Sequence, residues 1–187
     1  LKLYYRFLNR DDNPISHAST GSSSFDGTND YIDCGDNLED WTNAPQKTMS
    51  IWVKNGGNTA DARIFNVGFE DSGAKTALGL GVDDGTDNKP YYFLRNTSAG
   101  SLKAEFGSAM DVGRWYHFVI VQDGANDKAY IYRDGTLEAT VSSVGEITQT
   151  TSQTAKIGRH WDSSGSHYFN GSIANVGIWS RALSASE

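Results

Sequence analysis

The sequence predicts an antiparallel all-β protein, a sandwich or a barrel, with residues 1–187 forming one domain. Short apolar runs recur at intervals of about 8–12 residues, the spacing expected of strands in such folds. The chain has 20 Gly but only 3 Pro, and 12% of its residues are aromatic, which is typical of many turns around a sizeable core. No amphipathic helical pattern, internal repeat or linker separates the runs.

The segment Trp115–Gly135 carries the strongest strand signal. Alternate residues of 115–121 face opposite ways, and both faces are apolar, so we expect a central strand. A polar loop leads to a second strand at 129–132. Asp134-Gly135 then predicts a tight hairpin turn, because both residues tolerate positive φ. In this interpretation Trp115 and His117 help to hold the core.

The remaining strands are predicted where apolar or alternating runs are bounded by turn residues. They are expected at 3–8, on either side of the turn at 26–30, and at 48–54, 64–69, 76–82, 91–94, 102–106, 137–141, 154–158 and 172–179. The segment 38–45 is expected to be irregular, with one helical turn. Gly79 and Gly81 leave one face of their strand without side chains, which indicates close approach by another segment or a ligand.

Charge and composition exclude several classes of function. The formal net charge of −7 argues against nucleic-acid binding, which needs a basic face. No apolar stretch approaches the roughly 20 residues that cross a bilayer, so no membrane insertion is expected. Cys34 has no second cysteine to pair with and is expected to pack as a small apolar residue. The chain begins inside a strand-like segment, which indicates a domain excised from a larger protein.

Several separated segments occur in an order typical of one family. They are Phe25–Ile32, Met49–Val53, Trp115–Val119, Tyr130–Gly135, Ile157–Arg159, Phe169–Ile173 and Ile178–Ser184. Together they resemble the laminin-G-like family of concanavalin A-like lectin/glucanase domains, in its pentraxin-related bacterial and phage branch. The resemblance spans nearly the whole chain and implies a jelly-roll sandwich of two antiparallel sheets, one concave, with any ligand or calcium held by rim loops. Ala174-Asn175 departs from the family, which often has two acidic residues there.

Glycan recognition is the first functional hypothesis. Sugars are held by an aromatic face against their C–H surface and by polar side chains on their hydroxyls. One loop before the last strand offers this mixture, and two further side chains are placed to line a concave sheet. The predicted ligand-binding residues are His160, Trp161, Asp162 and Tyr168 in the loop, with Tyr91 and Arg95 on the sheet. In the alternative interpretation Trp161 anchors the loop on the sandwich and Tyr91 is a core or surface position.

Calcium is the cofactor that the resemblance implies. In calcium-binding members an acidic residue follows the strand that corresponds to 64–69, and another oxygen ligand precedes the strand of Ile157-Gly158. The predicted metal ligands are Glu70, Asp71, Asp83 and Gln153. Only neutral oxygens precede the second strand, so a modest affinity is expected. Alternatively, these acidic residues are solvated turn residues.

Hydrolysis is less favoured. Retaining glycosidases need two carboxyl groups about 5–5.5 Å apart. The family's glucanases carry them on one strand in a Glu-x-Asp-x-x-Glu type motif, and none of the Glu residues of this chain has that spacing. We therefore expect no enzymatic activity.

The sequence thus predicts a non-catalytic recognition or adhesion module that binds a glycan or glycoprotein through rim loops. The alternative is a structural or decorating component of a phage virion or surface layer, with neighbouring virion subunits as partners. Either role places the domain outside a cell, on a cell surface or on a virion.

Overall fold

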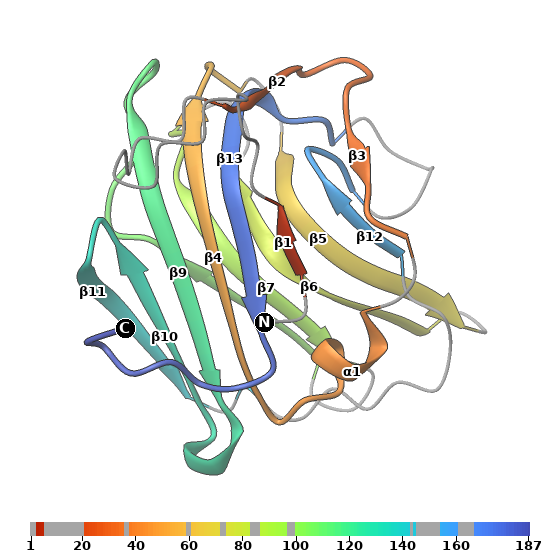
Figure 1. Ribbon diagram of the computed structural model, residues 1–187, viewed down its shortest axis with the longest axis vertical. Helices are drawn as coiled ribbons and strands as arrows, with labels where there is room; N and C mark the ends of the chain where they lie inside the picture. Colours follow the sequence, from red (N-terminus) through yellow and green to blue (C-terminus); the bar gives the residue numbers. More distant parts are fainter. Residues whose placement is uncertain are drawn as a thin grey trace.

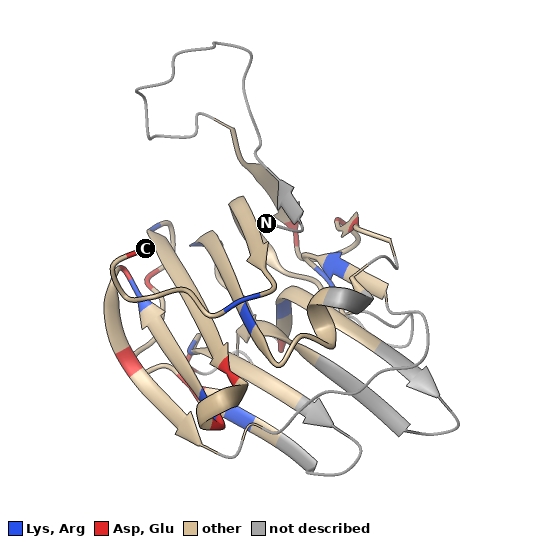
Figure 2. Cartoon of the chain, turned by 60° about the horizontal axis from the view of Figure 1, so that its bottom comes forward, with Lys and Arg blue, Asp and Glu red and all other residues tan. Residues whose placement is uncertain are grey.

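The computed structural model shows two antiparallel sheets packed face to face (Figure 1). It describes residues 3–5, 21–35, 38–58, 61–71, 74–82, 87–96, 100–142, 144, 154–160 and 167–187. Within these ranges the two-sheet arrangement confirms the predicted jelly-roll sandwich. Acidic and basic residues are interspersed along the strands and loops that Figure 2 draws in colour.

Sheet A is seven-stranded, in the order β1-β13-β4-β9-β10-β11, with β2 also paired to β13. Its strands are β1 (Leu3–Tyr5), β2 (Ser23–Asp26), β4 (Gln46–Asn55), β9 (Trp115–Asp123), β10 (Lys128–Arg133), β11 (Thr136–Ser142) and β13 (Asn170–Trp179). Because β9 lies between β4 and β10, the predicted central strand is confirmed.

Sheet B is six-stranded, in the order β3-β12-β5-β6-β7-β8. Its strands are β3 (Ile32–Asp33), β12 (Thr154–Ile157), β5 (Ala62–Asp71), β6 (Ala74–Val82), β7 (Pro90–Asn96) and β8 (Gly100–Glu105). The helical segments are α1 (Glu39–Thr42), which confirms the predicted turn, and the 3-10 turn η1 (Gly124–Asn126). Among the described residues, no helix has the length and apolar character needed to cross a membrane.

The core fills the space between the two sheets. Trp41 of α1 packs edge-on against Phe65 of β5, and Phe106 packs edge-on against Phe118 of β9. All four rings are almost completely buried. Each contributes about 1.5–3 kcal/mol to folding through the apolar area removed from water. Cys34 is half-buried against this core, as predicted.

The hairpin predicted at Asp134-Gly135 is present between β10 and β11. Both residues have positive φ, 50° and 80°. Two-residue hairpin turns with positive φ at both positions favour Asp-Gly, because these residues tolerate that conformation. The preceding loop is shorter than predicted, because Gln122 and Asp123 still pair with β10. The sequence signal underestimates this strand because its last two residues are polar.

The expectation that Trp115 and His117 hold the core is wrong. Tyr116 and Phe118 occupy the core side of β9, so the alternation of a strand sends their neighbours to the outer face of sheet A. There His117 stacks on Trp52 with ring centroids 4.9 Å apart. Trp52 is 39% exposed, so it obeys the alternation of its strand as an outward residue.

The side-chain-free face of β6 is approached closely, as predicted. A Cβ on Gly81 would lie 2.6 Å from the ring of Tyr91, and one on Gly79 would lie 2.1 Å from the carbonyl oxygen of Phe65. The Tyr91 ring therefore lies across the strand where a side chain would otherwise stand.

Candidate functional site

The candidate site lies where β3, β12 and the segment before β13 meet. Gly158 directly follows β12 and has a φ of +83°; its N–H donates to the carbonyl of Ile64 and its carbonyl accepts from the N–H of Phe169, each at 2.9 Å. These two bonds fix both ends of the 159–168 loop beside the start of β5. Arg159 is the first side chain after this anchor.

Tyr31 approaches the end of β12 from the segment between β2 and β3. Asp26 accepts hydrogen bonds from the N–H groups of Thr28 and Asn29, which close the turn after β2. These bonds stabilise the carboxylate and hold the pKa of Asp26 below its ordinary value. The chain then enters β3, whose Ile32 pairs with Ile157 of β12, so Tyr31 lies next to the end of β12.

We call Tyr31, Lys156, Arg159 and Tyr168 the arginine clamp. The guanidinium carbon of Arg159 lies 5.0 Å from the ring centroid of Tyr31 and 5.1 Å from that of Tyr168. The ammonium of Lys156 lies 5.4 Å from the Tyr31 ring. Arg159 is only 9% exposed, whereas Tyr31 is 42% exposed. Cations over aromatic faces are attracted by the ring quadrupole, so both cations help to fix the Tyr31 ring.

A second group, the Asp61 hub, comprises Asp61, Arg63, Tyr91 and His167. The Tyr91 hydroxyl and the Arg63 guanidinium both donate to one carboxylate oxygen of Asp61. The Nδ1 of His167 lies 2.9 Å from the Asp61 carbonyl oxygen. Since a carbonyl oxygen only accepts, this Nδ1 carries a proton.

The clamp and the hub are joined by His160, whose ring centroid lies 5.3 Å from that of His167. His160 directly follows Arg159, and His167 directly precedes Tyr168. We refer to the clamp, the hub and His160 together as the rim site. It presents aromatic rings, cationic donors and one carboxylate within a single surface region.

Part of the sequence-predicted ligand set lies in the rim site. The structure brings His160, Tyr168 and Tyr91 together there. Trp161 and Asp162 lie outside the described residues, as does the side chain of Arg95, whose backbone pairs with Ala77 and Ser101. Tyr91 is 4% exposed, so its hydroxyl positions Asp61 and Arg63 rather than offering a ring face.

Other members of the rim site were missed. Tyr31, Lys156, Asp61 and Arg63 come from three parts of the chain that meet only through strand pairing. The available sequence signal was the set of family-typical segments, since Tyr31 lies in one of them and Arg159 in another. That signal says which residues are typical, and it does not say which of them touch.

The structure describes only part of the predicted calcium site. Glu70 and Asp71 lie within β5, and Asp71 pairs with Ala74. Val82, the residue before Asp83, pairs instead with Ala62 at the other end of the ten-residue strand β5, about 30 Å away at roughly 3.3 Å per residue. Gln153 and Asp83, and the side chains of Glu70 and Asp71, lie outside the described set. No cluster of metal-binding side chains occurs among the side chains that are described.

A separate polar and aromatic group lies on the outer face of sheet A. His117 stacks on Trp52, and its Nε2 lies 2.8 Å from the Ser50 hydroxyl. Burial lowers the pKa of His117 below its ordinary value, and the nearby Asp134 carboxylate opposes that shift. His117 is therefore more resistant to protonation in the folded than in the unfolded protein.

This pKa shift predicts a pH dependence of stability. Because the unfolded chain binds a proton near the ordinary histidine pKa of 6.5 and the folded protein binds it only at lower pH, the stabilisation is complete above pH 6.5. It is lost as the pH falls from there through the lowered pKa. Urea unfolding at a series of pH values from 7.5 to about 5 should show a smaller pH slope for His117→Gln than for the wild type. Identical slopes would contradict the assignment.

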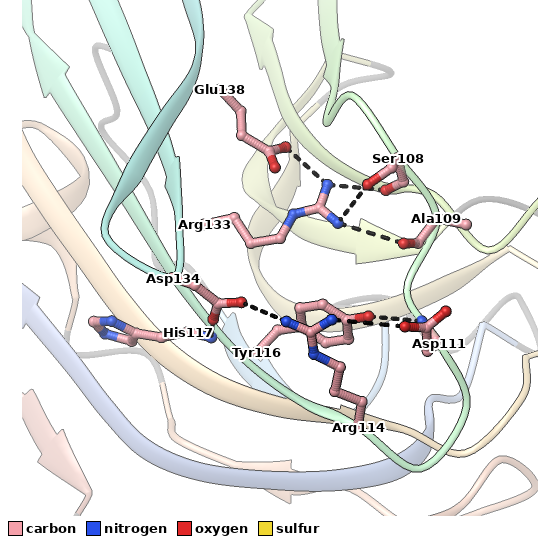
Figure 3. A network of polar contacts seen from close by, with 9 residues as sticks. All are labelled: Ser108, Ala109, Asp111, Arg114, Tyr116, His117, Arg133, Asp134 and Glu138. Carbon is pink, nitrogen blue, oxygen red and sulfur yellow. Dashed lines mark hydrogen bonds and ion pairs between the residues drawn. The ribbon is translucent and has the colours of Figure 1, made fainter.

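A buried arginine on the other side of β10 donates hydrogen bonds from both terminal nitrogens of its guanidinium (Figure 3). Arg133 is 6% exposed and donates to Glu138 at 2.7 Å, and to the hydroxyl and carbonyl oxygens of Ser108 at 3.1 and 2.9 Å. A further bond reaches the carbonyl of Ala109. These contacts tie the segment before β9 to β10 and β11, so Arg133 has a structural role.

Comparisons with solved structures give the same fold. The carbohydrate-binding module CBM40 of the Ruminococcus gnavus IT-sialidase matches with a TM-score of 0.69 and 18% identity over 87% of this chain and 91% of that one. Domain 4 of AbnA, a GH43 extracellular arabinanase from Geobacillus stearothermophilus, matches with a TM-score of 0.67 and 19% identity over 88% and 73%. The heptameric SAP-like pentraxin of Limulus polyphemus matches with a TM-score of 0.61 and 18% identity over 87% and 76%.

Sequence comparison identifies the family. A search of curated protein sequences found no match. The family model described as the concanavalin A-like lectin/glucanases superfamily matches residues 26–187, which covers both sheets except β1 and most of β2. This agrees with the ordered segments of the sequence and with the two-sheet architecture. The chain therefore belongs to the concanavalin A-like lectin/glucanase superfamily.

Proposed function

We propose that the protein is a non-catalytic module that recognises a glycan at the rim site. The observation that carries this proposal is the environment of Tyr31, whose exposed ring lies beside the cationic side chains of Arg159 and Lys156. A sugar ring can stack its C–H face on Tyr31 while the neighbouring donors bind its oxygens. The Asp61 hub adds imidazole and carboxylate groups at the border of the same region.

The ligands of similar proteins support the proposal. The Ruminococcus gnavus module has been solved with α2,3-sialyllactose and with α2,6-sialyllactose, and the arabinanase domain with arabinotriose. Because these proteins are below 20% identical to this chain, their likeness establishes the fold. Transfer of glycan binding to the rim site is our inference and depends on the residues described above.

We propose no hydrolytic step at this site. Glycoside hydrolysis by the usual mechanisms needs two carboxyl groups separated by about 5–10 Å. The rim site contributes Asp61, and both Tyr91 and Arg63 already donate to its carboxylate. A carboxylate engaged in this way is poorly placed to act as a nucleophile or base.

The role of Tyr31 is tested by Tyr31→Ala. A glycan array would identify a ligand, and calorimetry would compare its affinity for wild type and variant. We expect a loss of about tenfold, because one aromatic stacking contact contributes roughly 0.5–1.5 kcal/mol and its buried area adds to this. Trp52→Ala is the matched control, since Trp52 is similarly exposed but lies on sheet A. A larger loss of affinity for Trp52→Ala than for Tyr31→Ala would place the binding site on sheet A and contradict the proposed location.

The same glycan array also tests the alternative function. If no glycan binds and the protein instead forms a stable homo-oligomer, the structural role on a virion or surface layer replaces the proposal. Glycan binding would support a working position outside a cell, on a cell surface or on a virion, where such ligands are displayed.

We also propose calcium as a cofactor, held near the end of β5 by Glu70 and Asp71 with Gln153. Support comes from the backbone register, because Gly68 pairs with Thr154, the residue that follows Gln153. Carboxylate and amide oxygens are the ligands that Ca²⁺ prefers. Array binding and the melting temperature would both be measured in calcium and in EDTA. Equal values in the two buffers would exclude this cofactor.

A further inference from the structure

We infer that the glycan bound at the rim site is acidic and that Arg159 binds its anionic group. This inference rests on the glycan-binding function proposed above and names its ligand class. The argument begins with the hydrogen bonds of Arg159. Within the described part of the chain, its guanidinium contacts two aromatic rings. It forms no ion pair with a carboxylate and no hydrogen bond there.

Arg159 remains charged in this environment. A guanidinium is protonated at every pH at which proteins are folded, so burial cannot be relieved by loss of the proton. Yet Arg159 is only 9% exposed, so more than nine-tenths of it is buried. A buried charge without a paired anion is unfavourable, and such charges in proteins are normally paired. The unfilled hydrogen-bonding capacity therefore requires an explanation.

Arg133 shows how the same chain treats a structural arginine. Both arginines are buried against aromatic rings, Arg133 against Phe106, Tyr116 and Phe118. Arg133 nevertheless donates to Glu138 and to backbone carbonyls. The two side chains match in burial and aromatic contact, but among the described residues Arg133 has an anionic partner and Arg159 has none. A ligand anion would supply for Arg159 what Glu138 supplies for Arg133.

The free edge of the guanidinium is accessible to such a ligand. Its Nε is completely enclosed and has no partner, whereas Nη1 and Nη2 are not among the completely enclosed atoms that lack a partner. Two terminal N–H groups on a planar fork match the oxygen spacing of a carboxylate or sulfate group and bind it through two parallel hydrogen bonds. Contact with the Tyr31 and Tyr168 rings fixes the fork before the ligand arrives, which reduces the entropy cost of binding.

A second cation strengthens the local field. Lys156 is 9% exposed, lies on the same Tyr31 ring and has no ion-pair partner among the described residues. The whole chain carries a net charge of −7, which at long range opposes an anionic ligand. At physiological ionic strength, however, charges more than about 8 Å apart are largely screened. The two nearby cations therefore dominate once the ligand reaches the rim site.

The chemical feature that Arg159 recognises is an oxyanion attached to a sugar. It can be the carboxylate of a sugar acid or a sulfate ester, and matched ligand pairs distinguish these two sources. One pair is 3′-sialyllactose and lactose, and another is an oligogalacturonate and its methyl ester. A sulfated galactan oligosaccharide and its desulfated form make the third pair. Calorimetry at about 50 and 300 mM NaCl would measure each affinity, because a charge-assisted contact weakens with salt.

The wild type should prefer the charged member of at least one pair by about tenfold or more, since hydrogen bonds to charged groups are stronger than those to neutral groups. Arg159→Gln should abolish that preference and its salt dependence while leaving the neutral ligand bound. Arg159→Lys, which keeps the charge and loses the fork, should retain part of the preference. Arg181→Gln is the matched control, because Arg181 is exposed and pairs with Glu187 in the C-terminal segment.

Each result decides the matter. Equal affinity for charged and neutral members in all pairs would overturn the anionic specificity while leaving glycan recognition intact. Failure of every ligand, neutral ones included, would instead count against the proposed function itself. If Arg159→Gln does not fold, Lys156→Gln provides the second variant and should lower the preference and the salt slope. If Lys156→Gln and folded Arg159→Lys both keep the full wild-type preference for the charged ligand, the inference is contradicted.

Discussion

Arg133→Met is expected to lower the free energy of unfolding by about 3–5 kcal/mol, because it removes one partner of a buried ion pair. The change leaves Glu138 without its cation, and the oxygens of Ser108 and Ala109 without their donor. Methionine fills most of the volume against the surrounding rings, so lost packing is a minor part of the effect. The result would show that this network holds the segment before β9 in place (Figure 3).

Urea unfolding measures this loss, and Arg114→Gln is its control. Arg114 belongs to the neighbouring contacts, at 3.7 Å from Asp111 and 3.6 Å from Asp134, but its side chain is 59% exposed. Exposed ion pairs contribute about 0–1 kcal/mol, so this variant should remain close to wild type. A loss for Arg133→Met no greater than that for Arg114→Gln would contradict the assigned role.

Gly158→Ala is expected to cost about 2–5 kcal/mol, from two separate causes. The φ of +83° is unfavourable for alanine, and the added Cβ would lie 2.4 Å from a ring carbon of Phe25. Relief of that clash requires movement of a core ring or of the bond between Gly158 and Phe169. Because Arg159 is the next residue, the variant should also weaken glycan binding at the rim site.

Two other glycines separate these causes. Gly113 has a φ of +82°, and an added Cβ would meet nothing within 4 Å, so Gly113→Ala carries strain alone and should cost about 1–2 kcal/mol. Gly107 has neither positive φ nor a close neighbour, so Gly107→Ala should be nearly neutral. Denaturant unfolding of the three variants should give losses in the order Gly158, Gly113, Gly107. Equal losses at Gly158 and Gly113 would remove the steric contribution.

The sequence predicts strands well where one face is buried. The alternation of 48–54 and 115–121, and the turn at Asp134-Gly135, follow from local chemistry and agree with the structure. Strand ends are less well predicted, because polar residues such as Gln122 continue a ladder without a hydrophobic signal. The predicted core position of His117 is wrong because both faces of 115–121 carry apolar residues, so the pattern does not show which face meets the core.

The rim site is only partly predictable for a different reason. Strand alternation does not reveal that β3 pairs with β12, and this pairing brings Tyr31 to Arg159. Nor can a sequence show that Arg133 has a carboxylate partner while Arg159 has none among the residues that the structure describes. The predicted His160 and Tyr168 were found from composition, since a polar and aromatic loop is a general indication of ligand binding.

Glycan recognition at the rim site is tested most directly by mapping backbone amide chemical shifts in the ¹⁵N-labelled protein during titration with the best array ligand. We expect the largest saturable shifts at Tyr31, Lys156, Arg159, His160 and Tyr168, with little change on β4 and β9. Shifts concentrated instead at Ser50–Lys54 and His117, with the rim site unmoved, would contradict this location.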